Sequence, residues 1–329
     1  FYAFSGNKLI TFAIIAFLTS STARFFIPAQ AATIPLIVGR ETLSFANALF
    51  LFTLMGSVIL GYSIASPIIE IFGGLESSGE LAPFLLSSVF VVIGFILLLG
   101  FKDIKGLKPE LPQGTIFKKT FLLLWQTVRE VRSNQKVSLP ILLLIFVELN
   151  LGILSVVFLE YVRRFLNLPL TSVGVVLMLP LIFGLIFGLT MLKKIQEKYS
   201  YRISISRAVL GIGVLFFLLG VLPVLGKGSI GIFFIRAFTS VAAFITGVLV
   251  LIISVQSRNL LQTSSSLAMQ GRIFSFLDIM IAIITPIPVL FIGFIADKIS
   301  LPGTFVFIGL ATIAAAIMGS RVFFGREIR

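Results

Sequence analysis

The chain has 329 residues, of which 58% are hydrophobic and 12% are charged. Soluble domains average about 25% charged residues, so this composition excludes an ordinary soluble protein and indicates a polytopic membrane protein. Histidine and cysteine are both absent, which excludes disulfide frameworks, thiol catalysis, histidine acid–base chemistry and zinc or haem sites built from those ligands. The formal net charge is +13, and the positions of these charges indicate membrane topology rather than nucleic-acid binding.

Nine segments are long and apolar enough to cross a hydrocarbon core of about 30 Å as helices, which takes about 20 residues each. In chain order they are Leu9–Ile27, Phe45–Phe72, Leu81–Phe101, Leu139–Leu159, Ser172–Leu192, Ser204–Leu225, Ile230–Val255, Ile273–Ala296 and Thr304–Val322. They are too long for barrel strands, which need about 9–11 residues. The sequence therefore predicts an all-α membrane protein with nine transmembrane helices.

Basic residues are unevenly divided between the two sides of this predicted bundle. When successive connections are assigned to alternate sides, 20 of the 26 lysines and arginines fall on one side and 6 on the other. The positive-inside rule places the basic side, with the C-terminus, in the cytoplasm, as expected for a multi-pass protein of the inner or plasma membrane. An odd number of spans then puts the N-terminus outside. Because the sequence starts at Phe1 without an initiator methionine, we expect further helices to precede it.

The longest connection, Lys102 to Ser138, predicts an amphipathic helix. Its apolar side chains share one face at helical spacing: Ile116, Phe117, Phe121, Leu124, Trp125, Val128 and Val131. Such a helix lies in the membrane surface with its basic residues toward anionic headgroups, although a solvated linker with incidental periodicity is the alternative. We therefore divide the chain into a three-helix remainder of an N-terminal bundle (1–101), a cytoplasmic linker (102–138) and a C-terminal six-helix bundle (139–329).

Two polar stretches carry a resemblance to a known family. The first runs from Arg24 through Pro28, Ala29 and Gln30 to Ile34-Pro35, and then Ala46-Asn47-Ala48. The second is Gln256-Ser257-Arg258-Asn259-Leu260-Leu261-Gln262, closed by Gln270-Gly271-Arg272-Ile273. They resemble loops of major facilitator superfamily transporters, and among these the exporter branch that handles drugs, macrolides and siderophores. On that mapping the chain holds helices four to twelve of a twelve-helix fold.

The resemblance implies two parallel helical repeats with substrate held between them near the midplane. It implies gating or loop roles for Arg24, Pro28, Gln30, Asn47, Pro67, Gly271 and Arg272. One departure concerns helix five of the family, whose antiporter signature is degenerate here: Gly61 and Pro67 are present, but Ser66 precedes the proline and Glu70 stands where glycine is expected. The direction of transport is therefore left open.

Ionisable residues inside spans are costly and are functional candidates by default. Glu148 shares a helix face with Gly152 and Ser155, Asp278 with Ser275, Ala282 and Thr285, and Arg236 with Ser240, Ala243 and Gly247. We expect these stripes to face a central cavity. The residues predicted to serve substrate or proton translocation are Glu148, Asp278, Arg236, Ser155, Thr285 and Ser240.

Structural alternatives accompany these predictions. Glu148 and Arg236 are candidates for a buried structural pair, Asp278 and Arg272 for a gating ion pair, and Arg24 for a headgroup anchor at the end of its helix. No constellation of nucleophile, base or metal ligands is recognisable, so the sequence does not indicate an enzyme or a cofactor.

The function predicted from the sequence is proton-coupled export of amphipathic small molecules by a monomeric secondary transporter. Removing a carboxylate from water favours its protonated form, and this provides a means of coupling. A lipid or lysophospholipid transporter of the same fold is an alternative, as is a non-transporting polytopic membrane protein.

Overall fold

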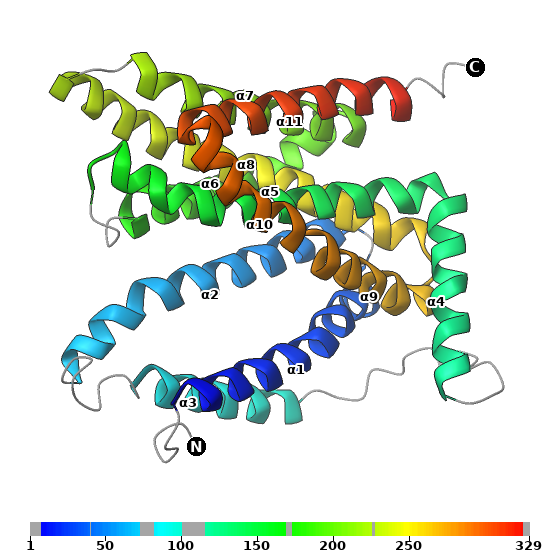
Figure 1. Ribbon diagram of the computed structural model, residues 1–329. Coiled ribbons are helices and arrows are strands. Elements are labelled where there is room, and N and C mark those ends of the chain that lie inside the picture. Colours follow the sequence, from blue (N-terminus) through cyan, green and yellow to red (C-terminus); the bar gives the residue numbers. More distant parts are fainter. Residues whose placement is uncertain are drawn as a thin grey trace.

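The computed structural model describes residues 8–39, 41–72, 82–100, 116–168, 173–225 and 228–324, which fold as helices with no strand among them (Figure 1). The helices are α1 (Lys8–Ile37), α2 (Leu43–Ile71), α3 (Ala82–Leu99), α4 (Ile116–Ser133), α5 (Gln135–Arg164), α6 (Leu179–Lys198), α7 (Tyr201–Leu225), α8 (Gly228–Ser264), α9 (Leu267–Ile284), α10 (Pro286–Ile299) and α11 (Leu301–Phe324). A π-helical turn, η4 (Gly174–Met178), leads into α6.

Six helical stretches in these described ranges are long and apolar enough to cross a membrane, and all of them follow residue 134. They are Gln135–Arg164, Gly174–Lys198, Tyr201–Pro223, Gly231–Ser264, Met269–Ile292 and Leu301–Gly319. The prediction of an all-α, membrane-embedded protein is thereby confirmed. The count of nine stays a prediction, because the apolar stretches found in α2 and α3 are shorter, Leu43–Leu54 and Phe84–Leu99.

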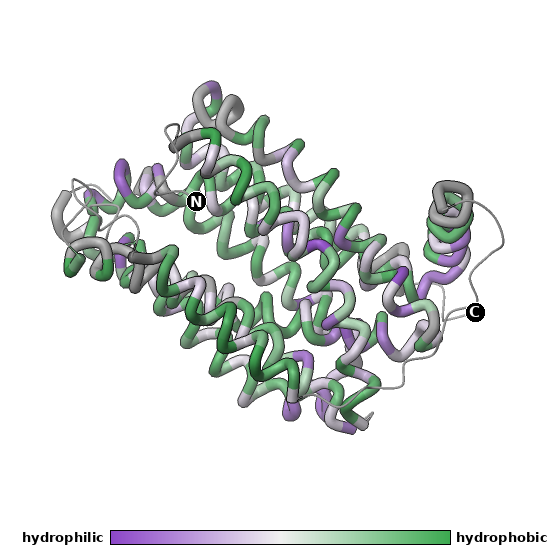
Figure 2. Tube along the Cα trace, turned by 90° about the horizontal axis from the view of Figure 1, so that it is seen from below, coloured by the Kyte–Doolittle hydropathy of each residue, from purple (hydrophilic) through white to green (hydrophobic). Residues whose placement is uncertain are grey.

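Most successive helices run in alternating directions, although α10 continues onward from α9 and α4 lies across the others, so most connections gather at two ends of the bundle (Figure 1). We call the end at which α1 leads to α2, α4 to α5, α6 to α7 and α8 to α9 the basic end, because it corresponds to the predicted basic side. In Figure 2 the helices are mostly hydrophobic, with hydrophilic residues at helix ends, on the helix at the basic end and at a few points inside the bundle. These interior polar points lead to the candidate site.

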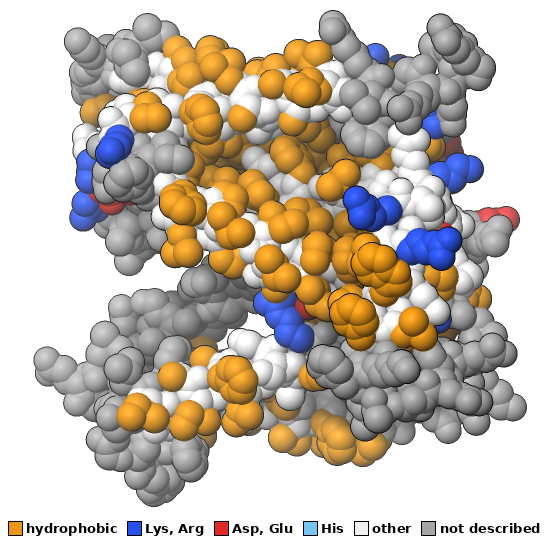
Figure 3. Space-filling model, turned by 45° about the vertical axis from the view of Figure 1, so that its right-hand side comes forward, with side chains coloured by type: hydrophobic (Ala, Val, Ile, Leu, Met, Phe, Trp, Pro, Cys, Tyr) orange, Lys and Arg blue, Asp and Glu red, His pale blue; other side chains and the backbone are white. Residues whose placement is uncertain are grey.

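The amphipathic segment forms α4, which stands across the ends of the other helices at the basic end (Figure 1). Two of its large apolar side chains are well exposed, Phe121 at 64% and Trp125 at 60%. Its inner face is held against the bundle by Val131, which packs on a cluster that includes Ile141 and Ile273. A helix that lies across the ends of the spans with apolar side chains exposed has the arrangement of a helix lying in a membrane surface. Hydrophobic side chains also cover much of the face of the bundle seen in Figure 3. The linker residues 102–115 lie outside the described ranges.

The helices α5 to α11 share an apolar core and pack closely through glycines. Near the far end, Tyr161 is fully buried and donates its hydroxyl to the carbonyl of Leu219 at 3.0 Å, with the ring of Phe305 5.0 Å away. On α6, a Cβ atom added to Gly184 would lie 1.9 Å from the carbonyl oxygen of Phe244. Small residues allow membrane helices this close approach, so α6 and α8 are tightly joined.

Two predicted boundaries were wrong. Helix α1 continues past Ile27 to Ile37, and α8 continues past Val255 to Ser264, so most of the two stretches expected as loops is helical. The span predicted from Ile273 to Ala296 matches the membrane-length stretch Met269–Ile292, in which the helix is interrupted at Thr285, between α9 and α10. Proline removes a backbone donor and interrupts the helical ladder, which accounts for the break before Pro286.

Candidate functional site

Helices α1 and α2 meet the later helices through a network of side-chain hydrogen bonds near the basic end. Asn47 on α2 is 1% exposed, and its Nδ2 donates to Asn259 Oδ1 at 2.7 Å and to Gln262 Oε1 at 2.5 Å, both on α8. Gln262 Nε2 donates in turn to the carbonyl of Ala31 on α1 at 3.0 Å. Each bond joins residues more than 200 positions apart, so the network fastens the first two helices to the C-terminal bundle.

A second part of the network joins α2 to α6 as well as to α8. Ser44 Oγ accepts hydrogen bonds from Gln196 Nε2 on α6, at 2.7 Å, and from Asn259 Nδ2. Gln270 on α9 donates to the carbonyl of Gln262 at 2.8 Å. We call Ser44, Asn47, Gln196, Asn259 and Gln262 the polar clasp.

Buried apolar side chains surround the polar clasp. Ala31 of α1 is 2% exposed within a cluster that includes Leu261 and Leu277. Ala48 and Leu51 of α2 are buried against α6 and α8. Asn47 and Gln262 are thus buried at the centre of the clasp, whereas Gln196 at its edge is exposed.

Farther from the basic end, an ion pair crosses the same interface. Arg24 Nη1 on α1 lies 2.9 Å from Asp278 Oδ1 on α9, with side-chain exposures of 53% and 17%. At 1.5 Å per residue, Arg24 is about 20 Å from the end of α1 and Asp278 about 16 Å from the start of α9. The pair thus lies near the middle of the bundle along the helix axes, and about half of the arginine side chain is accessible.

Two further charged residues lie close to this interface. Glu148 is near the middle of α5 and interacts electrostatically with Arg258 on α8 and with Asp278. The Arg258 guanidinium carbon is 5.4 Å from the centroid of the Phe50 ring on α2, a cation–π contact between the two parts. The Nε atom of Arg258 is buried without a hydrogen-bond partner. Two carboxylates and two guanidinium groups from four helices thus form a charged cluster.

The pairings expected from the sequence differ from those observed. Arg236 does not pair with Glu148: its Nε and Nη2 donate to the carbonyls of Leu166 and Asn167 at 2.8 and 3.2 Å, beyond the end of α5. Asp278 pairs with Arg24 rather than with Arg272, whose Nη1 lies 3.4 Å from Gln126 Oε1 on α4. Arginine side chains are long enough to reach partners on neighbouring helices, so the spacing of charges along one helix does not determine which of them pair.

The Arg236 stripe faces a helix rather than a cavity. Ser240 Oγ donates to the carbonyl of Val176 at 3.0 Å, and Ala243 is 5% exposed. A Cβ atom on Gly247 would lie 2.2 Å from the carbonyl oxygen of Leu181. The expectation that this stripe lines the central cavity was wrong, because small residues serve close helix packing as well as cavities.

The other predicted site residues are placed as follows. Ser155 is exposed and donates to the carbonyl of Gly152 at 2.7 Å, whereas Thr285 Oγ1 is buried without a partner at the α9–α10 break. Within α1, Pro28 is buried and Gln30 exposed, and Gly271 is part of α9, one residue before Arg272. Pro67 is in α2, but its side chain lies outside the described residues, as does that of Glu70.

Sequence reasoning missed the roles of Arg258, Asn259 and Gln262, which were assigned to a loop. Their signal is present in the sequence: Val255, Arg258, Asn259 and Gln262 recur at three- and four-residue spacing and continue the face of Leu251. Among the described residues, no group of three or more acidic, histidine or cysteine side chains gathers to hold a metal ion.

Comparison with known proteins adds no relative. No family model matches the chain, and there is no significant match among curated proteins or solved structures. The charged cluster and the polar clasp must therefore be interpreted from their own geometry.

Proposed function

We propose that this protein is a secondary active transporter of the major facilitator type, which moves amphipathic small molecules by alternating access in exchange for protons. One observation carries the proposal: an ion pair between Arg24 and Asp278 links the two parts of the bundle far from the ends of both helices, and the arginine remains half exposed. Charged groups at such depth face the interior of a bundle or a water-filled cavity. An accessible pair at this depth is what a solvated pathway between two helical units requires.

The interface is also suited to opening and closing. The parts α1–α3 and α5–α11 are joined through α4, and their described mutual polar contacts are a few side-chain hydrogen bonds and one ion pair. By contrast, α6 and α8 are held by backbone approach at glycines. Units that are rigid within themselves and weakly joined move as rigid bodies, which is the motion of alternating access.

Proton coupling follows from the chemistry of the pair. A protonated Asp278 no longer attracts Arg24, so proton binding weakens the contact between α1 and α9. Glu148 adds a second carboxylate close to Asp278 and Arg258. Binding of a cationic or polar substrate group competes with the same guanidinium and carboxylate groups, so proton and substrate exchange through one conformational change.

Topology completes the proposal. We place nine spans of a twelve-helix fold in this sequence, with the basic end in the cytoplasm of an inner or plasma membrane and α4 on the cytoplasmic surface. The transporter acts as a monomer. Because the polar clasp lies at the basic end, this conformation is closed to the cytoplasm.

Removing and then exchanging the two charges of the Arg24–Asp278 pair tests the proposal. The protein, expressed from its complete gene and reconstituted in proteoliposomes, should show substrate-dependent proton flux for a panel of amphipathic cations. Arg24→Gln and Asp278→Asn should each abolish gradient-driven flux, and the double exchange Arg24→Asp with Asp278→Arg should restore part of it. Glu148→Gln should uncouple substrate movement from the pH gradient.

The ion pair of Glu160 with Arg163 is the matched control, since it lies at the exposed end of α5 within one helix. Glu160→Gln should leave flux unchanged. Normal pH-dependent flux in both Asp278→Asn and Glu148→Gln would refute the proposed coupling.

A further inference from the structure

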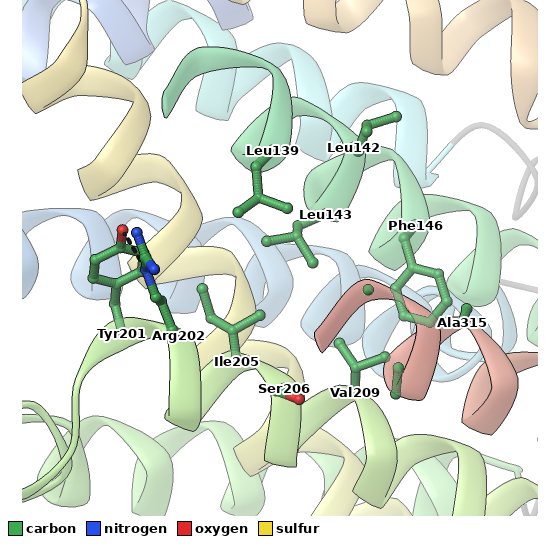
Figure 4. A pocket seen from close by; sticks show the side chains of 12 residues that line it. Leu139, Leu142, Leu143, Phe146, Tyr201, Arg202, Ile205, Ser206, Val209 and Ala315 are labelled. Atoms are coloured by element: carbon green, nitrogen blue, oxygen red, sulfur yellow. Dashed lines mark hydrogen bonds between the residues drawn. The ribbon is translucent and has the colours of Figure 1, made fainter. Parts of the chain in front are cut away.

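A cavity of about 160 Å³ opens between α5, α7 and α11, away from the charged cluster. Its walls include Leu139, Leu143 and Phe146 of α5 and Ile205 and Val209 of α7, and they are almost wholly apolar. Figure 4 shows these side chains pointing into one space, with Ala315 of α11 on the far wall. An apolar cavity of about 150 Å³ accommodates benzene, so this one accommodates a short length of hydrocarbon chain.

Small residues on α11 create the cavity. Ala315, Ala316 and Gly319 line it where larger side chains would fill it. Leu142 of α5, another lining residue, is 53% exposed. The space therefore reaches the outer surface of the membrane-embedded bundle rather than the contact between its two parts.

The cavity is polar at one end only. In Figure 4, Tyr201 and Arg202 stand at one end, while Phe146 and Ala315 lie toward the other. Arg202 Nε donates to the hydroxyl of Tyr201 at 3.1 Å. Both residues are in the first turn of α7 at the basic end, where unpaired backbone N–H groups favour negative charge.

The segment that leads into this polar end is rich in basic residues. Between residues 193 and 207 the chain carries Lys193, Lys194, Lys198, Arg202 and Arg207, with Glu197 as the one acidic residue. Tyr199 lies between two of these cations, 5.5 Å from Lys198 Nζ and 4.9 Å from Arg207 Cζ at its ring centroid. Arg202 is the basic residue that lines the cavity, and a basic side chain beside an apolar space between membrane helices is suited to an anionic lipid headgroup.

We infer that the α5–α7–α11 cavity binds one anionic glycerophospholipid, with a segment of acyl chain between the three helices and its phosphate at Arg202. The apolar walls exclude a free phosphate as the ligand, because most of the cavity offers it no hydrogen bonds. Because Arg202 places a positive charge at one end of the cavity, a purely apolar ligand is not the best fit. Lipid so bound bridges α5 and α11, which otherwise leave this space between them.

Native mass spectrometry of the intact protein in detergent tests the inference, with phosphatidylglycerol and phosphatidylcholine of identical acyl chains as probes. We expect one phosphatidylglycerol molecule to be retained in preference to phosphatidylcholine. Arg202→Gln should lower phosphatidylglycerol retention about fivefold, the effect of one basic residue at an anionic surface, and should leave phosphatidylcholine unchanged. Ala315→Leu should reduce retention of both lipids by filling the cavity.

Matched controls exist on the same helices. Ala314→Leu on α11 and Arg163→Gln at the opposite end of α5 change exposed residues that do not line the cavity, and both should bind lipid as the unaltered protein does. Ala315 is itself exposed, so its replacement leaves the core intact, which circular dichroism checks. Equal retention of the two lipids, or displacement of phosphatidylglycerol by glycerol phosphate, would overturn the inference. So would an Ala315→Leu variant with unaltered binding.

Discussion

Removing the amide of Asn47 should open the basic end. Asn47→Ala deletes two hydrogen bonds to α8, and an interhelical hydrogen bond in a membrane contributes about 0.6 and at most about 1.7 kcal/mol. The contact between the two parts therefore loses about 1 to 3 kcal/mol. This difference raises the population of the open state about 5- to 150-fold.

Cysteine labelling measures that population directly, because the chain contains no cysteine. Ala48 is 0% exposed beside the clasp, so Ala48→Cys reacts with a water-soluble maleimide only when the contact opens. We expect its labelling rate to rise by the factor given above when Asn47→Ala is added. The measurement is made in the reconstituted protein at fixed pH, since the thiolate is the reactive form.

Two controls separate opening from unfolding. Ala242→Cys, 1% exposed inside the C-terminal bundle, should stay unreactive in both backgrounds. Asn150→Ala removes another buried amide, 6% exposed, whose bond to the carbonyl of Phe146 stays within one helix, and should leave Ala48→Cys labelling unchanged. If Asn47→Ala leaves the labelling of Ala48→Cys unaltered, or raises that of Ala242→Cys equally, the clasp does not hold the two parts together.

Three further predictions concern the rest of the bundle. Gly184→Ala should lower the free energy of unfolding by about 1–3 kcal/mol through overpacking against α8. Gly94→Ala should not lower it, because no atom lies within 4 Å of its added Cβ. Thermal unfolding in detergent measures both variants. Trp125 is the single tryptophan, and its fluorescence should be quenched most by lipids brominated near the headgroup and least by those brominated at the chain end, as for a surface helix. Arg236→Ala leaves two carbonyls beyond α5 unpaired and should destabilise the fold by about 1–3 kcal/mol without altering the pH dependence of transport.

Much of the helical content follows from apolar segment length alone. Six predicted spans match helices that meet the length and hydropathy of a membrane span, and the amphipathic spacing around Trp125 predicted α4. The positions of the helix ends were harder to predict from the sequence. Polar residues such as Asn259 and Gln262 look like loop residues in sequence, but they continue α8 because their side chains hydrogen-bond to Ser44 and Asn47 on α2.

The sequence identified several residues of the candidate site but not which of them bond to one another. Asp278, Arg24 and Asn47 were all named as candidates, and all three bond across the interface. Their partners depend on how α1 lies against α9, which one sequence does not encode locally. Arg236 was also named as a candidate, but it does not bond across the interface. Its guanidinium group donates to two backbone carbonyls just beyond the end of α5.

The contrast between these contacts bears on how the molecule moves. Within the C-terminal bundle, backbone atoms of α6 and α8 touch at Gly184 and Gly247, so separating them exposes a large area of matched surface. Between the two parts, the clasp bonds are made by side-chain amides that exchange partners after a small rotation. Breaking them needs only a few kcal/mol. The contacts between the two parts are thus weaker than those within the C-terminal bundle, and the coupling proposed above places its change of charge at Asp278, on this weaker interface.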